Sequence, residues 1–174
     1  TIYNSNISNN FSGANGSAVW FVGLGTFLMD NVIISNNEGN GFETYCSDAP
    51  CDDSNDYWPN GILDNVTISS NSGEGIRTLK NSTITNSTIS HNQSTGIYRV
   101  ENIIIENSDI IGNGIGSDNS LNGGGIMIAI DATLNNVNIY NNRNNSYNGG
   151  GIYLSDDDSN IDAGTVSLSN VSIH

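Results

Sequence analysis

Seven copies of one short phrase recur along this chain, and they constrain its fold more than any single residue does. The phrase is an aliphatic residue, a spacer, Asn, a small residue, a spacer and Ile, as at positions 63–68, 84–89 and 105–110. Its asparagine returns at intervals of 21 to 34 residues: Asn4, Asn31, Asn65, Asn86, Asn107, Asn136 and Asn170. A period of this size indicates a solenoid, and the longer intervals indicate loops inserted into a 21-residue unit, since surface insertions cost little.

Apolar or small residues alternate with polar residues inside each phrase, which indicates strands with one buried face. About three such strands per repeat, separated by Asn, Ser and Gly, predict an all-β fold. We expect a single-stranded parallel β-helix of about seven rungs with inserted loops, stacked at ~4.8 Å. Two interior columns should result: Ile7, Ile34, Ile68, Ile89, Ile110, Ile139 and Ile173, and Ile2, Met29, Leu63, Ile84, Ile105, Leu134 and Leu168.

The phrase asparagines are expected at tight turns, because Asn tolerates left-handed backbone geometry. Stacked there, their amides can hydrogen-bond from coil to coil. In six repeats a second Asn follows six residues later, and then a small and an aliphatic residue, as in Gly75-Ile76 and Gly96-Ile97.

The leucine-rich repeat is the competing fold, because Leu63, Val66, Ile68 and Asn71 fit its template. That template requires an apolar residue two positions after the second Asn, where this chain mostly has Ser, Gly or Asn. The remaining segments lack helical periodicity, and the aliphatic residues are mainly Ile and Val, which favour strands. These observations favour the β-helix.

The charge of the chain restricts its partners. Four Lys and Arg residues stand against 18 acidic residues, and the net charge is −14. Phosphate backbones would be repelled, so nucleic-acid binding is not expected. No stretch approaches the ~20 apolar residues of a membrane-spanning helix. The chain opens and closes inside a repeat without the polar caps that solenoids need. We therefore expect residues 1–174 to be a single β-helical segment of a larger protein, or a unit whose ends pair with other copies.

Residues 43–60 form the longest departure from the repeat and contain both cysteines. The close spacing of Cys46 and Cys51 predicts a small disulfide and hence an oxidising, extracellular setting. Two unpaired thiols are the alternative. A zinc site is disfavoured, because neither a His nor a second Cys pair is near in sequence.

Several Asn-x-Ser/Thr sequences occur, most of them by-products of an Asn-rich repeat. Asn15 and Asn144 lie in loops and are the expected glycosylation sites if the host glycosylates. Asn65, Asn86 and Asn170 hold the ladder position, where a buried amide could not carry a glycan.

The phrase and the following Gly-Ile pair resemble the right-handed parallel β-helix of the pectate-lyase-like superfamily. The sequences of residues 122–126 and 148–152, Asn-Gly-Gly-Gly-Ile, are most similar to repeats of polymorphic outer-membrane proteins and related bacterial or archaeal surface proteins. The resemblance covers nearly the whole chain and implies a right-handed β-helix. It implies no single activity, because relatives include lyases, hydrolases, adhesins and passenger domains.

Catalysis is not expected in this segment. The Asn-Thr-Asp, Gly-His-Gly and Arg-Ile-Lys motifs of the hydrolases in that superfamily are missing. A lyase needs a base beside bound Ca²⁺, and Arg77, Lys80 and Arg99 do lie on adjacent coils. However, Lys80 should stack over Glu101 as an ion pair between strands.

No cofactor is predicted, although calcium remains an option. Acidic residues in two inserted loops are weak Ca²⁺ candidates: Asp52, Asp53, Asp56, Asp156 and Asp158. Solvated acidic loops are the favoured interpretation.

One outward column combines aromatic and charged residues: Trp20, Glu43, Arg77, Tyr98, Met127 and Tyr153. Trp20, Arg77, Tyr98 and Tyr153 are the candidate carbohydrate-binding residues, because flat rings with polar tips can stack on sugars. Ordinary strand propensity is the competing explanation. Tyr45, Tyr57 and Trp58, in or beside the cysteine loop, are further exposed-aromatic candidates.

The favoured functional hypothesis is a non-catalytic, secreted structural or adhesive segment of a cell-surface or filament protein. Its partners would be polysaccharides, cell-surface glycans or other copies of itself. A carbohydrate-binding module and a polysaccharide lyase or glycoside hydrolase are the alternatives.

Overall fold

The structure is a computed structural model that describes residues 1–12, 16–23, 25–46, 58–116, 124–144, 149–155 and 164–174. All regular elements in these residues are strands. The first seven are β1 (Ile2–Ser8), β2 (Ser17–Val22), β3 (Thr26–Ser35), β4 (Asn40–Tyr45), β5 (Asn60–Ser69), β6 (Ile76–Lys80) and β7 (Thr83–Thr85). The others are β8 (Thr88–Ser90), β9 (Ile97–Ile111), β10 (Ile126–Tyr140), β11 (Ile152–Leu154), β12 (Val166–Ser169) and β13 (Ser172–Ile173).

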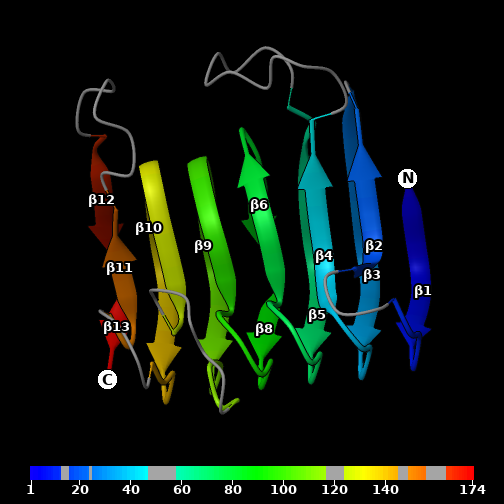
Figure 1. Cartoon of the computed structure of the whole chain (residues 1–174). Coiled ribbons are helices and arrows are strands. Elements are labelled where there is room, and N and C mark those ends of the chain that lie inside the picture. Colours follow the sequence, from blue (N-terminus) through cyan, green and yellow to red (C-terminus); the bar gives the residue numbers. More distant parts are fainter. Residues whose placement is uncertain (13–15, 24, 47–57, 117–123, 145–148, 156–163) are drawn as a thin grey trace.

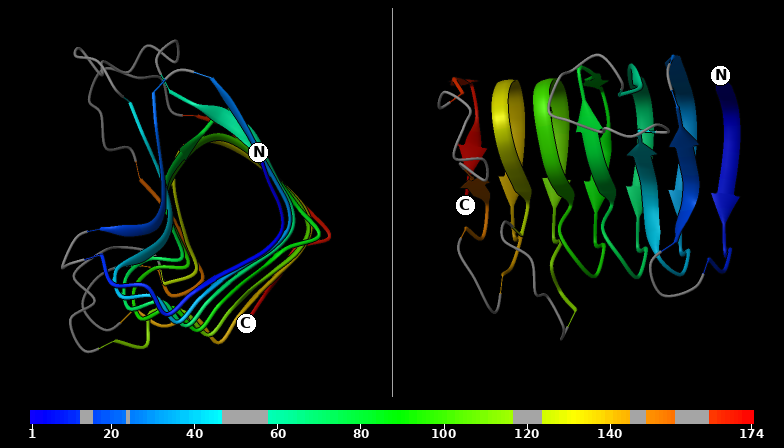
Figure 2. Two further views of the ribbon diagram at one scale, coloured as in Figure 1. Left: turned by 90° about the vertical axis from the view of Figure 1, so that its right-hand side faces the viewer. Right: turned by 45° about the horizontal axis from the view of Figure 1, so that its top comes forward.

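Successive coils stack side by side from the N-terminal to the C-terminal end of the molecule (Figure 1). Viewed along the stack, the chain winds repeatedly around one central core (Figure 2). Each strand pairs in parallel with its equivalent in the next coil, as β1 does with β3 and β3 with β5. The predicted parallel β-helix is therefore confirmed.

Both predicted interior columns are in register. Ile7 pairs with Ile34 and Ile34 with Ile68, and the column continues through Ile89, Ile110 and Ile139 to Ile173. The second column runs without a break from Ile2 to Leu168. The middle members of both columns are buried. The last members, Leu168 and Ile173, are exposed, because the last rung has a neighbour on one side only within this chain. Stacked aliphatic side chains thus form the core.

The phrase asparagines occupy a corner of the coil, as predicted. All seven have left-handed backbones, with φ between 46° and 55°. Amides of neighbouring rungs bond to one another there: the Nδ2 of Asn31 donates to the Oδ1 of Asn4 at 2.7 Å, and that of Asn136 to Asn107 at 2.8 Å. At Asn86 the ladder is interrupted, because its Nδ2 donates to Asp64 Oδ1 instead, at 2.7 Å.

This corner is exposed to solvent, which corrects one expectation. Asn65, Asn86 and Asn170 are exposed rather than buried, so burial does not bar them from carrying a glycan. The reason is that a left-handed residue at a sharp corner points its side chain away from the core.

A second amide ladder is formed by the asparagine that follows six residues later in six repeats: Asn10, Asn37, Asn71, Asn92, Asn113 and Asn142. Its four central members are buried, whereas Asn10 is exposed and Asn142 half-buried. In the ladder Asn71 Nδ2 donates to Asn92 Oδ1 at 2.9 Å, and Asn92 Nδ2 donates to Asn113 Oδ1 at 3.0 Å. The same oxygens also accept backbone N–H groups, and the second amide hydrogen of Asn92 bonds to the carbonyl of Ile68. Each buried amide is therefore satisfied by the next rung, which removes the cost of its desolvation.

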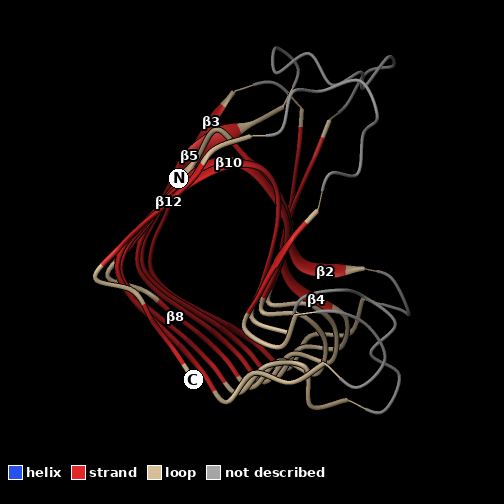
Figure 3. Cartoon of the chain, turned by 90° about the vertical axis from the view of Figure 1, so that its left-hand side faces the viewer, coloured by secondary structure: helices blue, strands red, loops and turns tan. Residues whose placement is uncertain are grey.

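The described loops of successive rungs lie over one another at shared corners of the coil (Figure 3). No helix in the described part of the chain is long and apolar enough to cross a membrane.

Candidate ligand-binding surface

The predicted outward column exists over its first four members. Trp20 on β2 pairs with Glu43 on β4, Glu43 with Arg77 on β6, and Arg77 with Tyr98 on β9. Trp20 is exposed, whereas Arg77 and Tyr98 are half-buried. Stacking at rung spacing therefore brings three of the four candidate residues onto one continuous stripe.

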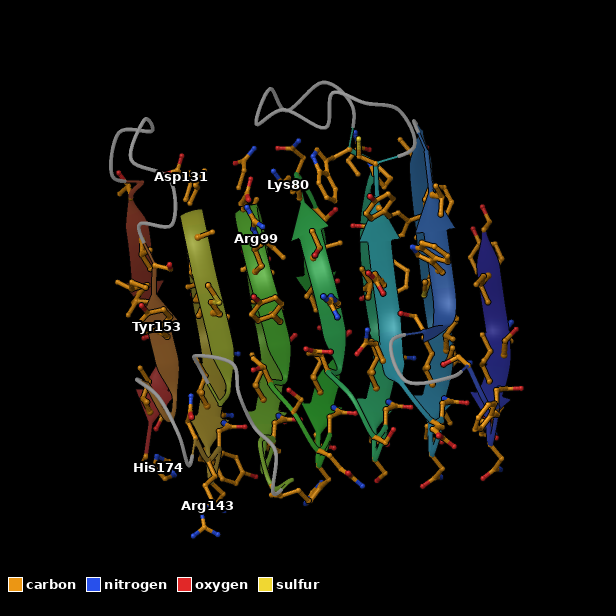
Figure 4. All side chains as sticks on the ribbon, viewed as in Figure 1. Lys80, Arg99, Asp131, Arg143, Tyr153 and His174 are labelled. Atoms are coloured by element: carbon orange, nitrogen blue, oxygen red, sulfur yellow. The ribbon has the colours of Figure 1, made fainter. Side chains whose placement is uncertain are left out.

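The column is interrupted at Met127, which the sequence predicts to be exposed and which is buried. Between Ile97 and Val100, β9 has two residues opposite the single Met127 of β10, so the register shifts there. Such a bulge re-aims side chains on the facing strand. Tyr153 pairs with Met127 and lies beyond the interruption, toward the C-terminal end (Figure 4). It is therefore separate from the Trp20–Tyr98 stripe.

Trp20 also belongs to a second group of rings that the sequence did not connect to it. The Trp20 and Tyr45 rings meet edge to face with centroids 6.1 Å apart, and those of Tyr45 and Trp58 at 6.4 Å. Trp20 is 60% exposed and Tyr45 48% exposed. We call Trp20, Tyr45 and Trp58 the aromatic cluster. Its rings come from two rungs and from the residues just before β5, so only the coiling of the chain brings them together.

A buried ion pair lies beneath the aromatic cluster. Lys80 Nζ is 2.5 Å from Glu101 Oε2, and the two side chains are 2% and 4% exposed. The Lys80 ammonium also lies 4.7 Å from the centre of the Trp58 ring, a cation–π contact. The predicted stacking of Lys80 over Glu101 is confirmed by the strand register.

Arg99 approaches the same carboxylate. Its Nε is 3.7 Å from Glu101 Oε1, and its side chain is half-exposed beside Lys80 (Figure 4). The Arg99 backbone is left-handed, with φ of 55°, which is costly for a residue with a long side chain. Two cations therefore face one carboxylate, and one of them, Lys80, also contacts Trp58 of the aromatic cluster.

Glu43 is the other anchored carboxylate of the stripe. Its Oε2 accepts hydrogen bonds from Ser17 Oγ at 2.5 Å and from Asn40 Nδ2 at 3.3 Å. Its Oε1 is 3.8 Å from Arg77 Nε. These partners hold the Arg77 guanidinium along the surface between Trp20 and Tyr98.

Glu74 lies close to this network and was missed by sequence reasoning. It is only 5% exposed, and its backbone N–H donates to Asn40 Oδ1 at 3.0 Å. Burial raises the pKa of the Glu74 carboxyl above its ordinary value, while a hydrogen bond from its own backbone N–H and the charge of Arg77 oppose the rise. A single Glu inside a Gly-rich turn gives no pattern from which this burial could have been predicted.

Other predicted site residues lie apart from this surface or outside the described residues. Cys46 is buried and disulfide-bonded, and the only other cysteine of the sequence, Cys51, lies outside the described residues. Asn144 is half-buried. The remaining candidates fall outside the described residues: Asn15, Asp52, Asp53, Asp56, Tyr57, Asp156 and Asp158. Within the described residues, no group of three or more His, Cys, Asp or Glu could hold a metal ion.

Comparison with known families agrees with the observed coil. The family model for the right-handed beta helix region matches residues 1–170. The chain belongs to this family. No curated protein and no solved structure matches it.

Membership of the right-handed beta helix family explains the coiled scaffold. It assigns no function to the surface, which has to be judged from the surface residues themselves. On this right-handed β-helix the aromatic cluster, the stripe and the buried Lys80–Glu101 pair are continuous. Flat apolar ring faces beside fixed polar groups suit ligands that combine apolar faces with hydroxyl groups.

Proposed function

We propose that this chain is a non-catalytic, extracellular β-helical scaffold of a cell-surface or filament protein, and that it adheres to glycans through the aromatic cluster. The observation that carries the proposal is the contact of three aromatic rings on the outer face, with Trp20 60% and Tyr45 48% exposed. Large exposed rings are costly unless they have a partner, and rings with a polar tip are well suited to sugars.

The scaffold part of the proposal is supported by the axial ladders. Five consecutive amide bonds join Asn10 to Asn142 through all intervening rungs. Because each rung bonds only to its neighbours, the coil acts as a stiff spacer that presents its outer face. The disulfide bond of Cys46 and the resemblance to surface-protein repeats support an extracellular setting.

The test is binding of the purified chain to an array of neutral and acidic polysaccharides. We expect Trp20→Ala and Tyr45→Ala to weaken binding about fivefold or more, since the loss of one stacked ring costs about 1 kcal/mol or more. Tyr3→Ala is the matched control, because Tyr3 is exposed on β1, away from the cluster. No binding by the wild-type chain, or equal loss in all three variants, would overturn the adhesive role.

A lyase or hydrolase is distinguished in the same samples. We expect neither new reducing ends nor unsaturated sugar products, with or without Ca²⁺. Product formation that Trp20→Ala leaves unchanged would show catalysis elsewhere on the chain.

A further inference from the structure

A groove of about 460 Å³ lies on the outside of the coil, away from the stripe. It crosses β3 and β5, which lie side by side (Figure 3), and reaches β7. The residues along it include Thr26, Leu28, Asn60, Ile62, Asn81 and Thr83. The left-handed backbone of Asn81, with φ of 48°, turns the chain between β6, which carries Arg77 of the stripe, and β7, which carries Thr83. The groove and the stripe are therefore on different faces.

The groove has a packed floor and an apolar wall. Phe27 is buried beneath it, and a Cβ added at Gly61 would come within 2.5 Å of the Phe27 ring. Leu28 and Ile62 are paired in register on adjacent rungs, and Ile62 is 48% exposed. Two aliphatic side chains at the spacing of the rungs thus offer a ligand an apolar surface that water now covers.

Polar groups without protein partners line the same groove. The side chains of Thr26, Asn60 and Thr83 make no hydrogen bond to another residue of the described part of the chain. Thr26 and Asn60 are paired in register and exposed, and Thr83 is half-buried. A hydroxyl group and an amide can each donate and accept. These three side chains can therefore exchange water for the hydroxyl groups of a ligand.

The charges around the groove favour a neutral ligand. Of the described residues that line it, none has a charged side chain. Asp30 and Asp64 lie two residues beyond Leu28 and Ile62 on the same strands, and alternate residues of a strand share a face. These carboxylates would repel an anionic sugar, and they would also repel a second copy of a chain whose net charge is −14.

We propose that this groove is a second glycan-binding site, which holds a sugar unit of a neutral oligosaccharide. The C–H face of the sugar packs on Leu28 and Ile62, and its hydroxyl groups bond to Thr26, Asn60 and Thr83. A volume of about 460 Å³ falls within the range of about 300–1,000 Å³ that is usual for small-molecule sites. The site goes beyond the proposed function, because it shares no residue with the aromatic cluster and does not depend on it.

The test is an NMR titration of the ¹⁵N-labelled chain with cellohexaose, mannohexaose and xylohexaose. We expect at least one of these neutral probes to shift the backbone amide signals of Gly61, Ile62 and Thr83 in a saturable way. The same shifts should persist in Trp20→Ala, because that residue belongs to the aromatic cluster on the other face.

Two substitutions with matched controls establish what the groove contributes. Ile62→Ala should weaken binding, followed through the groove signals, about tenfold, because it removes most of the apolar wall. Thr83→Val should weaken it about fivefold, because it keeps the shape of the side chain and removes one hydrogen bond. Ile33→Ala and Thr88→Val are the controls: Ile33 is 44% exposed on β3 and Thr88 half-buried on β8, both beyond the asparagine corner. Both controls should bind as wild type does, and circular dichroism establishes that all four variants are folded.

Each other outcome overturns part of the inference. Groove signals that respond to none of the three probes, or equal weakening in the variants and their controls, would overturn the site and leave the aromatic cluster untouched. A stronger response of the groove to trigalacturonic acid than to every neutral probe would overturn the neutral ligand class. Groove shifts that disappear in Trp20→Ala would overturn the independence of the two sites. Groove shifts without any response of Trp20, Tyr45 or Trp58 would support the groove and contradict the proposed role of the aromatic cluster.

Discussion

Two asparagine ladders run along this β-helix, and they differ in almost everything except the residue. The ladder through Asn37, Asn71, Asn92 and Asn113 is buried, and each amide makes hydrogen bonds to the next rung and to a backbone carbonyl. The ladder through Asn31 and Asn65 lies at an exposed corner, where water can replace each bond. In the buried ladder the side-chain amides need hydrogen-bond partners. In the exposed ladder asparagine suits the left-handed backbone of the corner.

The same repeated residue therefore has two roles. At one position its side-chain amide forms hydrogen bonds, and at the other its backbone adopts the left-handed conformation. Stacking brings amides together in both ladders, but only burial makes their bonds costly to lose. The same substitution in each ladder should therefore have very different effects.

Asn92→Ala should give the largest effect, a loss of about 3–5 kcal/mol of unfolding free energy. It removes the acceptor of two Asn71 donors and the donor to Ile68 O, all of them buried. Guanidinium denaturation measures the loss, and hydrogen exchange should show faster exchange in the rungs on either side. A loss below about 1 kcal/mol would mean that water enters the ladder and replaces the amide.

Asn65→Ala should cost about 1 kcal/mol, because Ala is less tolerant than Asn of the φ of 52° at this corner. Asn65→Gly is the matched control and should be nearly neutral, since Gly adopts this backbone freely. Denaturation midpoints of the two variants measure the difference. Equal losses for both would show that the side-chain bonds, and not the backbone, stabilise the corner.

Asp64→Asn should give the smallest effect, a loss of a few tenths of a kcal/mol near neutral pH that disappears at low pH. Hydrogen bonds from Asn86 and Thr85 hold the pKa of Asp64 below its ordinary value. A lowered folded-state pKa contributes stability above the unfolded pKa, and this stability is lost as pH falls through the folded value. Wild type should therefore lose slightly more stability than Asp64→Asn between about pH 6 and about pH 3, measured by thermal unfolding. An identical pH dependence in the two proteins would mean that the exposed bonds are replaced by water.

The candidate surface was only partly predictable. Trp20, Arg77 and Tyr98 could be placed on one stripe because the repeat spacing fixes which residues stack. The predicted exposure of Met127 was wrong, because one extra residue in β9 shifts the register there. No sequence pattern marks that bulge. Tyr45 and Trp58 were recognised as exposed aromatics, but the contacts of Trp20 with Tyr45 and of Tyr45 with Trp58 depend on how the coil places β2, β4 and the start of β5 side by side.

The sequence alone determined the coil, its parallel pairing and both aliphatic columns, because a fixed period of alternating residues permits only one stacked register. It also determined the left-handed corners, since that geometry is a local property of Asn. Only the tertiary structure decided which ladder is buried, which aromatic rings meet, and where Glu74 loses contact with water. Burial depends on what covers a residue from neighbouring rungs and loops, and that information is not local to any repeat.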